Sequence, residues 1–425
     1  MLALRCLHQV GAPRWMHRLR WDFLRVPVVY NSFVSHEDLS QLSDPEFVLR
    51  TRDNLDARRC KINFGRLLHL HKCYVAGDTS VLEELVNLFS QLPNTTHPST
   101  PVGGPTKFQE ISTHGEKRTA SHKLPSASAF SSRPPSTKSW TVSDRLRCYP
   151  NAHLRLTHVG RSTGDRTYYF GGPLAQLESA LVDYTLHRLT TAGFTPVSVP
   201  DILPESVIRA CGFPTRGVRS QVYKIYRSST ESTYCLSGTS EMALAGFCAG
   251  RLFGPTEESA IGLCSASRCY RQEAPNQEAS LYRVHQFTKV EMFAISAPEL
   301  SACDNMFEKI LQVQTNLFAD LGLHFRVLEM PTADLGNSAH RKVDIEAWMP
   351  GENMYGEISS TTSCLDYQAK RLNIKWRSPH GETYAYTDGA VVIPAVLLPF
   401  LPQIEIPAHQ NNVLSFKRIS HQKQS

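Results

Sequence analysis

Two neighbouring stretches decide the fold of this 425-residue chain: SRCYRQEA at 267–274 and LYRVHQFTKVEMF at 281–293. They predict two β-strands joined by a loop of about ten residues. Side chains two apart on a strand share one face, so we expect Arg271 and Glu273 to point the same way. Arg283 follows the loop, and Glu291 lies on the return strand. Two guanidinium groups beside a carboxylate suit a phosphate and the edge of a base, although a salt-bridged hairpin would have the same residues.

The sequence from about 140 to 400 alternates short strands with helices. Helices are predicted from Pro173 to Gly193 and over Pro298–Leu321 and Ser363–Leu372. Strand-like stretches are Tyr234–Leu236, Ala266–Tyr270, Val284–Ala294, His324–Glu329, Val343–Trp348, Tyr355–Ser360 and Thr383–Asp388. Consecutive strands with short turns and interspersed helices predict an α+β domain with a mostly antiparallel sheet.

The two opening stretches resemble motif 2 of class II aminoacyl-tRNA synthetases of the seryl type, mitochondrial members above all. Further seryl-type segments follow the family's order: LSGTSE at 236–241, the motif 1-like segment from Gly193 to Asp201, FRVL at 325–328, KVDIEAWMP at 342–350, GEISS at 356–360 and DYQAKR at 366–371. The resemblance covers about residues 150 to 400. It implies a class II core, an antiparallel sheet flanked by helices, and a dimer formed through motif 1.

The resemblance also implies roles for individual residues. Thr239 and Glu241 would hold the amino end of serine, and Glu291 would contact the same substrate. The ATP site would be lined by Arg271 at the α-phosphate, Glu273 at adenine, Arg283, Val284 and Phe287 along the triphosphate, and Glu357 and Ser360 at metal and phosphates.

Motif 3 departs from the family. The arginine that grips the γ-phosphate belongs at Ala395, and no Arg or Lys occurs from Gly381 through Ala408. Asp388 is expected to add a negative charge near the phosphates, and Pro399 is expected to break the motif 3 helix early. Serine activation depends on positioning and charge neutralisation, so these losses predict an inactive site.

The N-terminal third is predicted to differ from the family's long two-helix coiled coil. Asp44 followed by Pro45 predicts the start of a helix, with Asp44 as its cap and Pro45 at its first position. Residues 1–33, Arg-rich and acid-poor, resemble a mitochondrial transit peptide, although an ordinary basic N-terminal helix would have the same composition. Residues 34–92 predict a shortened helical arm that binds tRNA through Arg50, Arg52, Arg58, Arg59, Lys61 and Arg66, although such a cluster can also be a solvated face. Residues 93–139, rich in Pro, Ser and Thr, predict a disordered linker. The synthetase-like domain is assigned to 140–408 and a tail to 409–425.

The composition is compatible with these predictions. The net charge of +6 permits RNA binding, and the eleven cysteines and seventeen histidines lack the spacing of a disulfide or metal framework. The departures resemble the non-charging seryl-tRNA synthetase-like insect mitochondrial proteins. This implies a matrix protein that binds RNA, for example serine tRNA, without a cofactor, as a homodimer or with the mitochondrial seryl-tRNA synthetase, and away from membranes. The alternatives are an active serine–tRNA ligase that uses ATP and Mg²⁺, and an assembly subunit that acts only through its dimer face.

Overall fold

The computed structural model describes most of the chain from residue 34 to residue 392. The described residues are 34–117, 154–155, 163–164, 166–215, 217, 220–225, 233–254, 259–273, 283–349 and 353–392. The predicted transit peptide, Ala395 with the rest of the motif 3 helix, and the tail lie outside these residues. Within the described residues, no helix is long and apolar enough to span a bilayer.

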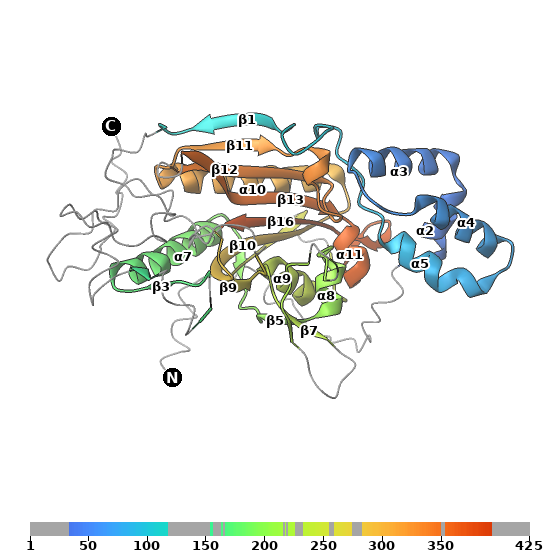
Figure 1. Ribbon diagram of the computed structural model, residues 1–425, viewed down its shortest axis with the longest axis horizontal. Coiled ribbons are helices and arrows are strands. Elements are labelled where there is room, and N and C mark those ends of the chain that lie inside the picture. The colour runs from blue at the N-terminus through green and yellow to red at the C-terminus, as the bar shows by residue number, and fades with distance from the viewer. Residues whose placement is uncertain are drawn as a thin grey trace.

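An eight-stranded sheet forms the body of the molecule (Figure 1). Its strands, in spatial order, are β1 (Gln109–His114), β11 (Phe325–Glu329), β12 (Arg341–Met349), β13 (Met354–Leu365), β16 (Tyr386–Val392), β10 (Gln286–Ser296), β9 (Ala260–Tyr270) and β4 (Thr195–Pro196). All neighbouring pairs are antiparallel except β4 with β9. The predicted antiparallel α+β core is therefore confirmed.

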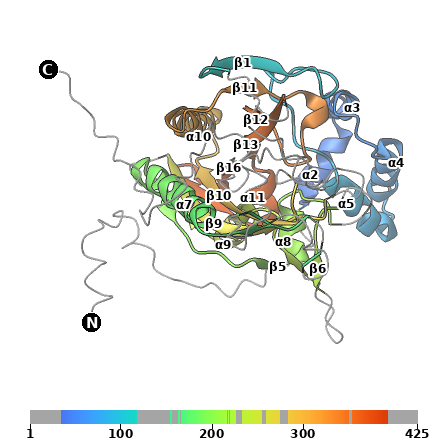
Figure 2. The ribbon, with the colours of Figure 1, turned by 60° about the vertical axis from the view of Figure 1, so that its left-hand side comes forward.

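Helices cover both faces of this sheet. On one face lie α7 (Pro173–Thr191) and α10 (Leu300–Asp320), whose apolar residues, such as Phe307 of α10, form clusters with the sheet that include Phe325 and Met292. On the other face lie α8 (Glu205–Ala210), α9 (Ser240–Cys248) and α11 (Tyr367–Leu372), packed on Phe293 and Ile295 (Figure 2). The second face is the one that carries the candidate site.

Smaller sheets and turns complete the body. The strands are β2 (Leu154–Arg155) with β3 (Tyr169–Phe170), then β5 (Ile202–Pro204), β7 (Tyr234–Leu236) and β6 (Lys224–Ile225), and finally β15 (Gly381–Tyr384), β14 (Lys375–Ser378) and β8 (Leu252–Phe253). The helix predicted from Ser363 begins later, because Ser363 still pairs with Asp388 in the sheet. The prediction that α7 stops at Gly193 is confirmed, since this glycine takes a left-handed φ of 93° just past the helix.

The hairpin predicted from the opening stretches is present, with one correction. β9 and β10 pair over eleven residues each, from Tyr270 opposite Gln286 to Ala260 opposite Ser296. β9 ends at Tyr270, so Arg271 and Glu273 lie beyond the strand and do not share a strand face. The Arg271 backbone N–H instead donates to the His285 carbonyl, which ties the loop's two ends together.

The N-terminal arm is a compact group of short helices beside the sheet (Figure 1). It contains α2 (His36–Ser40), η2 (Gln41–Ser43), α3 (Pro45–Ala57), α4 (Phe64–Val75), η3 (Thr79–Val81) and α5 (Leu82–Ser90). Asp44 caps α3, with Pro45 at its first position, as predicted. Buried leucines, among them Leu55, Leu67 and Leu85, hold the helices together. The longest arm helix has 13 residues, about 20 Å, so the arm is not a long coiled coil.

The prediction of a linker without structure over 93–139 is wrong for residues 93–117. Asn94 and His97 make backbone hydrogen bonds to Asn337 and His340, and β1 adds a strand to the edge of the sheet beside β11. The content of proline and threonine suggested disorder, but the segment is ordered by hydrogen bonds to residues more than 200 positions away, which local composition does not reveal. The remaining residues of that prediction, 118–139, lie outside the described residues.

Candidate functional site

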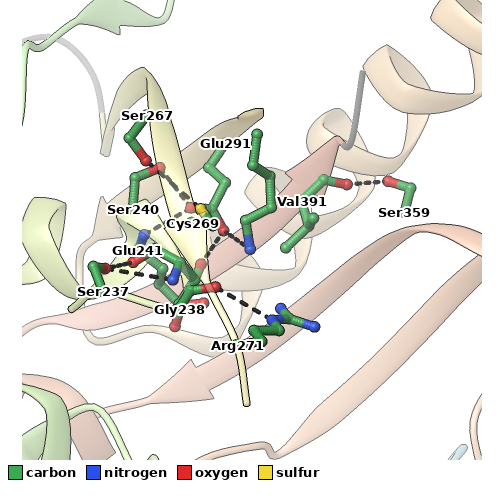
Figure 3. A network of polar contacts seen from close by, with 12 residues as sticks. Ser237, Gly238, Ser240, Glu241, Ser267, Cys269, Arg271, Glu291, Ser359 and Val391 are labelled. Carbon is green, nitrogen blue, oxygen red and sulfur yellow. Dashed lines mark hydrogen bonds and ion pairs between the residues drawn. The ribbon is translucent and has the colours of Figure 1, made fainter. Parts of the chain in front are cut away.

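Glu291 is the centre of a buried polar network on the face covered by α9 (Figure 3). Strand β10 points its side chain toward the N-terminus of α9. The Glu291 carboxylate accepts hydrogen bonds from the Thr239 and Ser240 hydroxyls, and from the Glu241 backbone N–H at 3.0 Å. A carboxylate at a helix N-terminus satisfies N–H groups that have no partner in the helix. The structure thus brings the predicted residues Thr239, Glu241 and Glu291 together.

Lys289 neutralises this carboxylate from the same strand. Its Nζ lies 2.8 Å from Glu291 Oε1, and both side chains are fully buried. Burial would raise the pKa of Glu291, but Lys289, together with Ser240 and Thr239, outweighs that effect and lowers the pKa below its usual value. Glu291 is therefore an ionised carboxylate.

Glu241 is the second carboxylate of the site and has a different environment. It lies in the first turn of α9 and is partly exposed, while one carboxylate oxygen accepts a hydrogen bond from Gln368 Nε2 at 2.6 Å. Burial, with the negative charge of Glu291 nearby, raises the pKa of Glu241 to about 7. Near neutral pH the pair therefore carries between one and two negative charges.

Arg271 borders the same network. Its Nε donates to the Gly238 carbonyl at 3.4 Å, and its guanidinium carbon lies 5.6 Å from the centre of the Phe287 ring. Phe287 and Val284 are buried and pack on Cys269, so they shape the wall behind Arg271. Glu273 and Arg283 stand at the two ends of the loop between β9 and β10, both half-buried.

A row of residues across the sheet links this site to Ser360. In the strand register, Glu291 lies opposite Val391, and Val391 lies opposite Ser360. Directly paired residues share one face, so Glu291 and Ser360 point to the same side, two strand spacings or about 10 Å apart.

A β-bulge places Glu357 on that face too. Glu346 pairs with Glu357 and Ile345 with Ser359, so β13 has one extra residue between these two pairs. Without the bulge, Glu357 and Ser360 would point to opposite faces, because they are three residues apart. The structure therefore groups Glu357 with Ser360, as the resemblance implies.

Lys342 occupies the same corner of the site, and the sequence alone did not single it out. Its Nζ lies 2.7 Å from Asp334 and 2.8 Å from Asp344. Burial would lower the pKa of Lys342, but Asp344, Glu357 and Asp334 raise it well above its usual value. Among the described residues, no three His, Cys, Asp or Glu side chains are grouped so as to hold a metal ion.

The expectation that Asp388 would face the phosphates is wrong. Its side chain is fully buried on the opposite face of β16, where the Cys303 thiol donates to it at 3.4 Å and Ser363 lies opposite in the sheet. Burial raises the pKa of Asp388 to about 7. The alternation of side chains along β16 explains the error, because Gly389 and not Asp388 faces Glu241.

Arg58 is a second correction, because it is not available to RNA. Its side chain is 5% exposed, and its guanidinium donates to the carbonyls of Thr95 and Ala339 at 2.8 Å. Arg58 therefore fastens the arm to the body. The other five basic residues predicted to contact RNA are exposed: Arg50, Arg52, Arg59, Lys61 and Arg66. Of these, Arg66 pairs with Glu84 at 2.6 Å and Arg50 with Glu46 at 3.5 Å.

Comparison with known proteins agrees with the fold. The tRNA synthetase class II core domain (G, H, P, S and T) matches residues 223–387. The mitochondrial serine–tRNA ligase of Mus musculus is 37% identical over 78% of this chain and 66% of the mouse protein. The mitochondrial enzyme of Bos taurus is 35% identical over 89% of this chain and 73% of the bovine protein.

A solved structure shows the same fold. The cytoplasmic serine–tRNA ligase of Naegleria fowleri, in complex with AMP, matches with a TM-score of 0.66 and 21% identity, covering 86% of this chain and 85% of that one. The residues matched by the family domain, 223–387, include Glu241 on α9, Glu291 on β10 and Ser360 on β13. The chain therefore belongs to the serine–tRNA ligase family of class II aminoacyl-tRNA synthetases.

Proposed function

We propose that this chain is a non-charging mitochondrial member of its family, which binds RNA and does not attach serine to tRNA. The observation that carries the proposal is the absence of Arg and Lys from Gly381 through Ala408, with alanine where the family has the motif 3 arginine. In serine activation the serine carboxylate attacks the α-phosphate of ATP and pyrophosphate leaves, so a cation is needed to hold the β- and γ-phosphates. Removal of one such preorganised contact costs about 10²–10³ in rate. In this proposal the residues expected to hold serine, Thr239, Glu241 and Glu291, are retained, while the arginine expected to hold the phosphates is replaced by Ala395.

An active serine–tRNA ligase is the second candidate. It is favoured by the intact grouping of Arg271, Glu241 and Glu291, and by Asp388, which is buried away from the site. In that case the oxygens of Glu357 and Ser360 would hold Mg²⁺, and the ion would offset the negative charge of the ATP phosphates. Incubation of the full chain with labelled serine, ATP and mitochondrial tRNA distinguishes the two: seryl-tRNA formed at the rate of a mitochondrial serine–tRNA ligase would refute our proposal.

RNA binding is assigned to the arm. Arg52, Arg59 and Lys61 are exposed, and no ion pair is found for them within the described residues. Such side chains neutralise phosphates and release counterions, so the affinity for RNA should fall steeply with salt. Electrophoretic mobility shifts with serine tRNA over a salt series test this. A chain that shifts no RNA at low salt would support the third candidate, an assembly subunit that acts through its dimer face.

Localisation and assembly follow from the family in this proposal. The mammalian relatives are mitochondrial enzymes, and the first 33 residues have the composition of a transit peptide. We place the chain in the mitochondrial matrix, paired through motif 1 with a second copy or with the mitochondrial seryl-tRNA synthetase. Cell fractionation, followed by affinity purification of the tagged chain, tests both assignments.

A further inference from the structure

Glu241 is held in place by residues from two other elements, α11 and β16. Within its own helix, α9, only the backbone N–H of Glu241 is anchored, by donating to the Glu291 carboxylate. The orientation of the Glu241 carboxylate must therefore come from its contacts with α11 and β16.

A two-step hydrogen-bond relay reaches Glu241 from β16. Thr387 Oγ1 lies 3.0 Å from Gln368 Oε1, and Gln368 Nε2 donates to Glu241 Oε1 at 2.6 Å. Thr387 and Gln368 are both fully buried. The Glu241 carboxylate selects the amide orientation that turns the Gln368 NH₂ toward it, since the reversed amide would set oxygen against carboxylate, and the Thr387 hydroxyl donates to the amide oxygen in that orientation. The Leu365 carbonyl, a competing acceptor for the Thr387 hydroxyl, is farther away at 3.3 Å.

Gly389, two residues along β16, supplies the second restraint. A Cβ at this position would lie 2.8 Å from both Cδ and Oε2 of Glu241. Heavy atoms do not approach this closely without a shift, and the mobile partner is the end of the glutamate side chain and not the sheet. The missing side chain at Gly389 thus makes room for the carboxylate directly against β16.

We infer that Thr387, Gln368 and Gly389 are positioning residues for Glu241: the relay fixes one carboxylate oxygen, and the glycine admits the other onto β16. The sequence assigned no role to any of the three, although Gln368 lies in the DYQAKR segment and Thr387 and Gly389 lie in the motif 3 stretch. The inference concerns the geometry of the retained carboxylate and holds whether or not the chain charges tRNA.

The test is the titration of Glu241 in the full chain labelled with carboxyl-¹³C glutamate, with its signal assigned by its loss in Glu241→Gln. Thr387→Val removes the relay's first donor at nearly constant volume, while Thr387→Ser keeps it. Loss of a hydrogen bond that favours the ionised form should raise the midpoint by about 0.5–1 pH unit in Thr387→Val and leave Thr387→Ser unchanged.

Gly389→Ala tests the second restraint on Glu241 by the same titration. It should also raise the midpoint, because the displaced carboxylate leaves Gln368. Gly336→Ala, where an added Cβ meets nothing within 4 Å, is the matched control and should not change it. Folded Thr387→Val and Gly389→Ala variants that titrate like the wild type would overturn the inference.

Discussion

The Lys289 ammonium lies 2.8 Å from the Glu291 carboxylate, and neither side chain is exposed to solvent. Both come from β10 and point to the same face, since they are two residues apart. The pair therefore places one positive and one negative charge inside the site, and leaves Glu241 as the carboxylate without a cation at ion-pair distance among the described residues. The stability of the site depends on this pairing.

Lys289→Met should strongly destabilise the chain. It leaves Glu291 buried without its cation, and breaking a buried ion pair in this way costs about 3–5 kcal/mol. Chemical denaturation at pH 7.5 measures the free energy of unfolding. The double variant Lys289→Met/Glu291→Gln removes both charges and should recover most of the loss. Equal destabilisation of the single and double variants would contradict the role given to the pair.

Asp388→Asn should change how stability depends on pH. The pKa of Asp388 is about 7 in the folded chain, above the value of about 3.9 for an unperturbed Asp, so its protonated form stabilises the fold. That contribution is complete below about pH 4 and is lost as pH rises through 7. Between pH 5.5 and 8.5 the wild type should lose about 2 kcal/mol that the variant does not lose.

Unfolding free energies at these two pH values test the difference. Glu241 also titrates near pH 7, so Glu241→Gln is measured alongside to separate its contribution. Parallel pH profiles for the wild type and Asp388→Asn would show that Asp388 is ionised in the folded chain.

Arg58→Ala should loosen the arm from the body. Removing the guanidinium leaves the buried carbonyls of Thr95 and Ala339 without their donor, and the expected loss is about 3 kcal/mol. Arg52→Ala, on an exposed face of α3, should change stability by no more than about 0.5 kcal/mol. Limited proteolysis should cut the arm of the Arg58→Ala variant faster than that of the wild type. Unchanged cleavage would contradict the inference that Arg58 fastens the arm to the body.

The combined variant Arg52→Ala/Arg59→Ala/Lys61→Ala should weaken RNA binding without unfolding the chain. Each lost phosphate contact should lower the slope of log affinity against log salt by nearly 1, so the three together should lower it by about 2–3. Filter binding over a salt series measures the slope. Removing the exposed Lys117 and Lys309, which lie outside the arm, should leave the slope unchanged. An equal fall in slope for this control variant would mean that RNA binding is not confined to the arm.

Local patterns predicted the parts of the fold that local residues determine. The strand-like stretch Val284–Ala294 predicted β10 with Glu291 on it, and Asp44 with Pro45 predicted the start of α3. The mitochondrial-type motif 2 then predicted the family. These succeed because strand alternation and helix capping act within a few residues.

Contacts between distant segments explain what the sequence did not predict. The burial of Arg58 depends on carbonyls about 280 residues away, and β1 exists because β11 offers it an edge. Lys289 could have been found, since a lysine two residues before a buried strand glutamate predicts a same-face ion pair. The approach of Gly389 to Glu241 has no local signal, because β16 and α9 meet only in the folded sheet.

The most direct test of the proposal is serine-dependent exchange of labelled pyrophosphate into ATP, which reports activation without requiring tRNA. The purified chain is compared with a mitochondrial serine–tRNA ligase at equal concentration, and Arg271→Ala provides the background. We predict exchange at the level of Arg271→Ala, because no cation between Gly381 and Ala408 replaces the motif 3 arginine. Exchange that approaches the rate of the mitochondrial ligase, and that Arg271→Ala abolishes, would contradict the proposal and show an active enzyme.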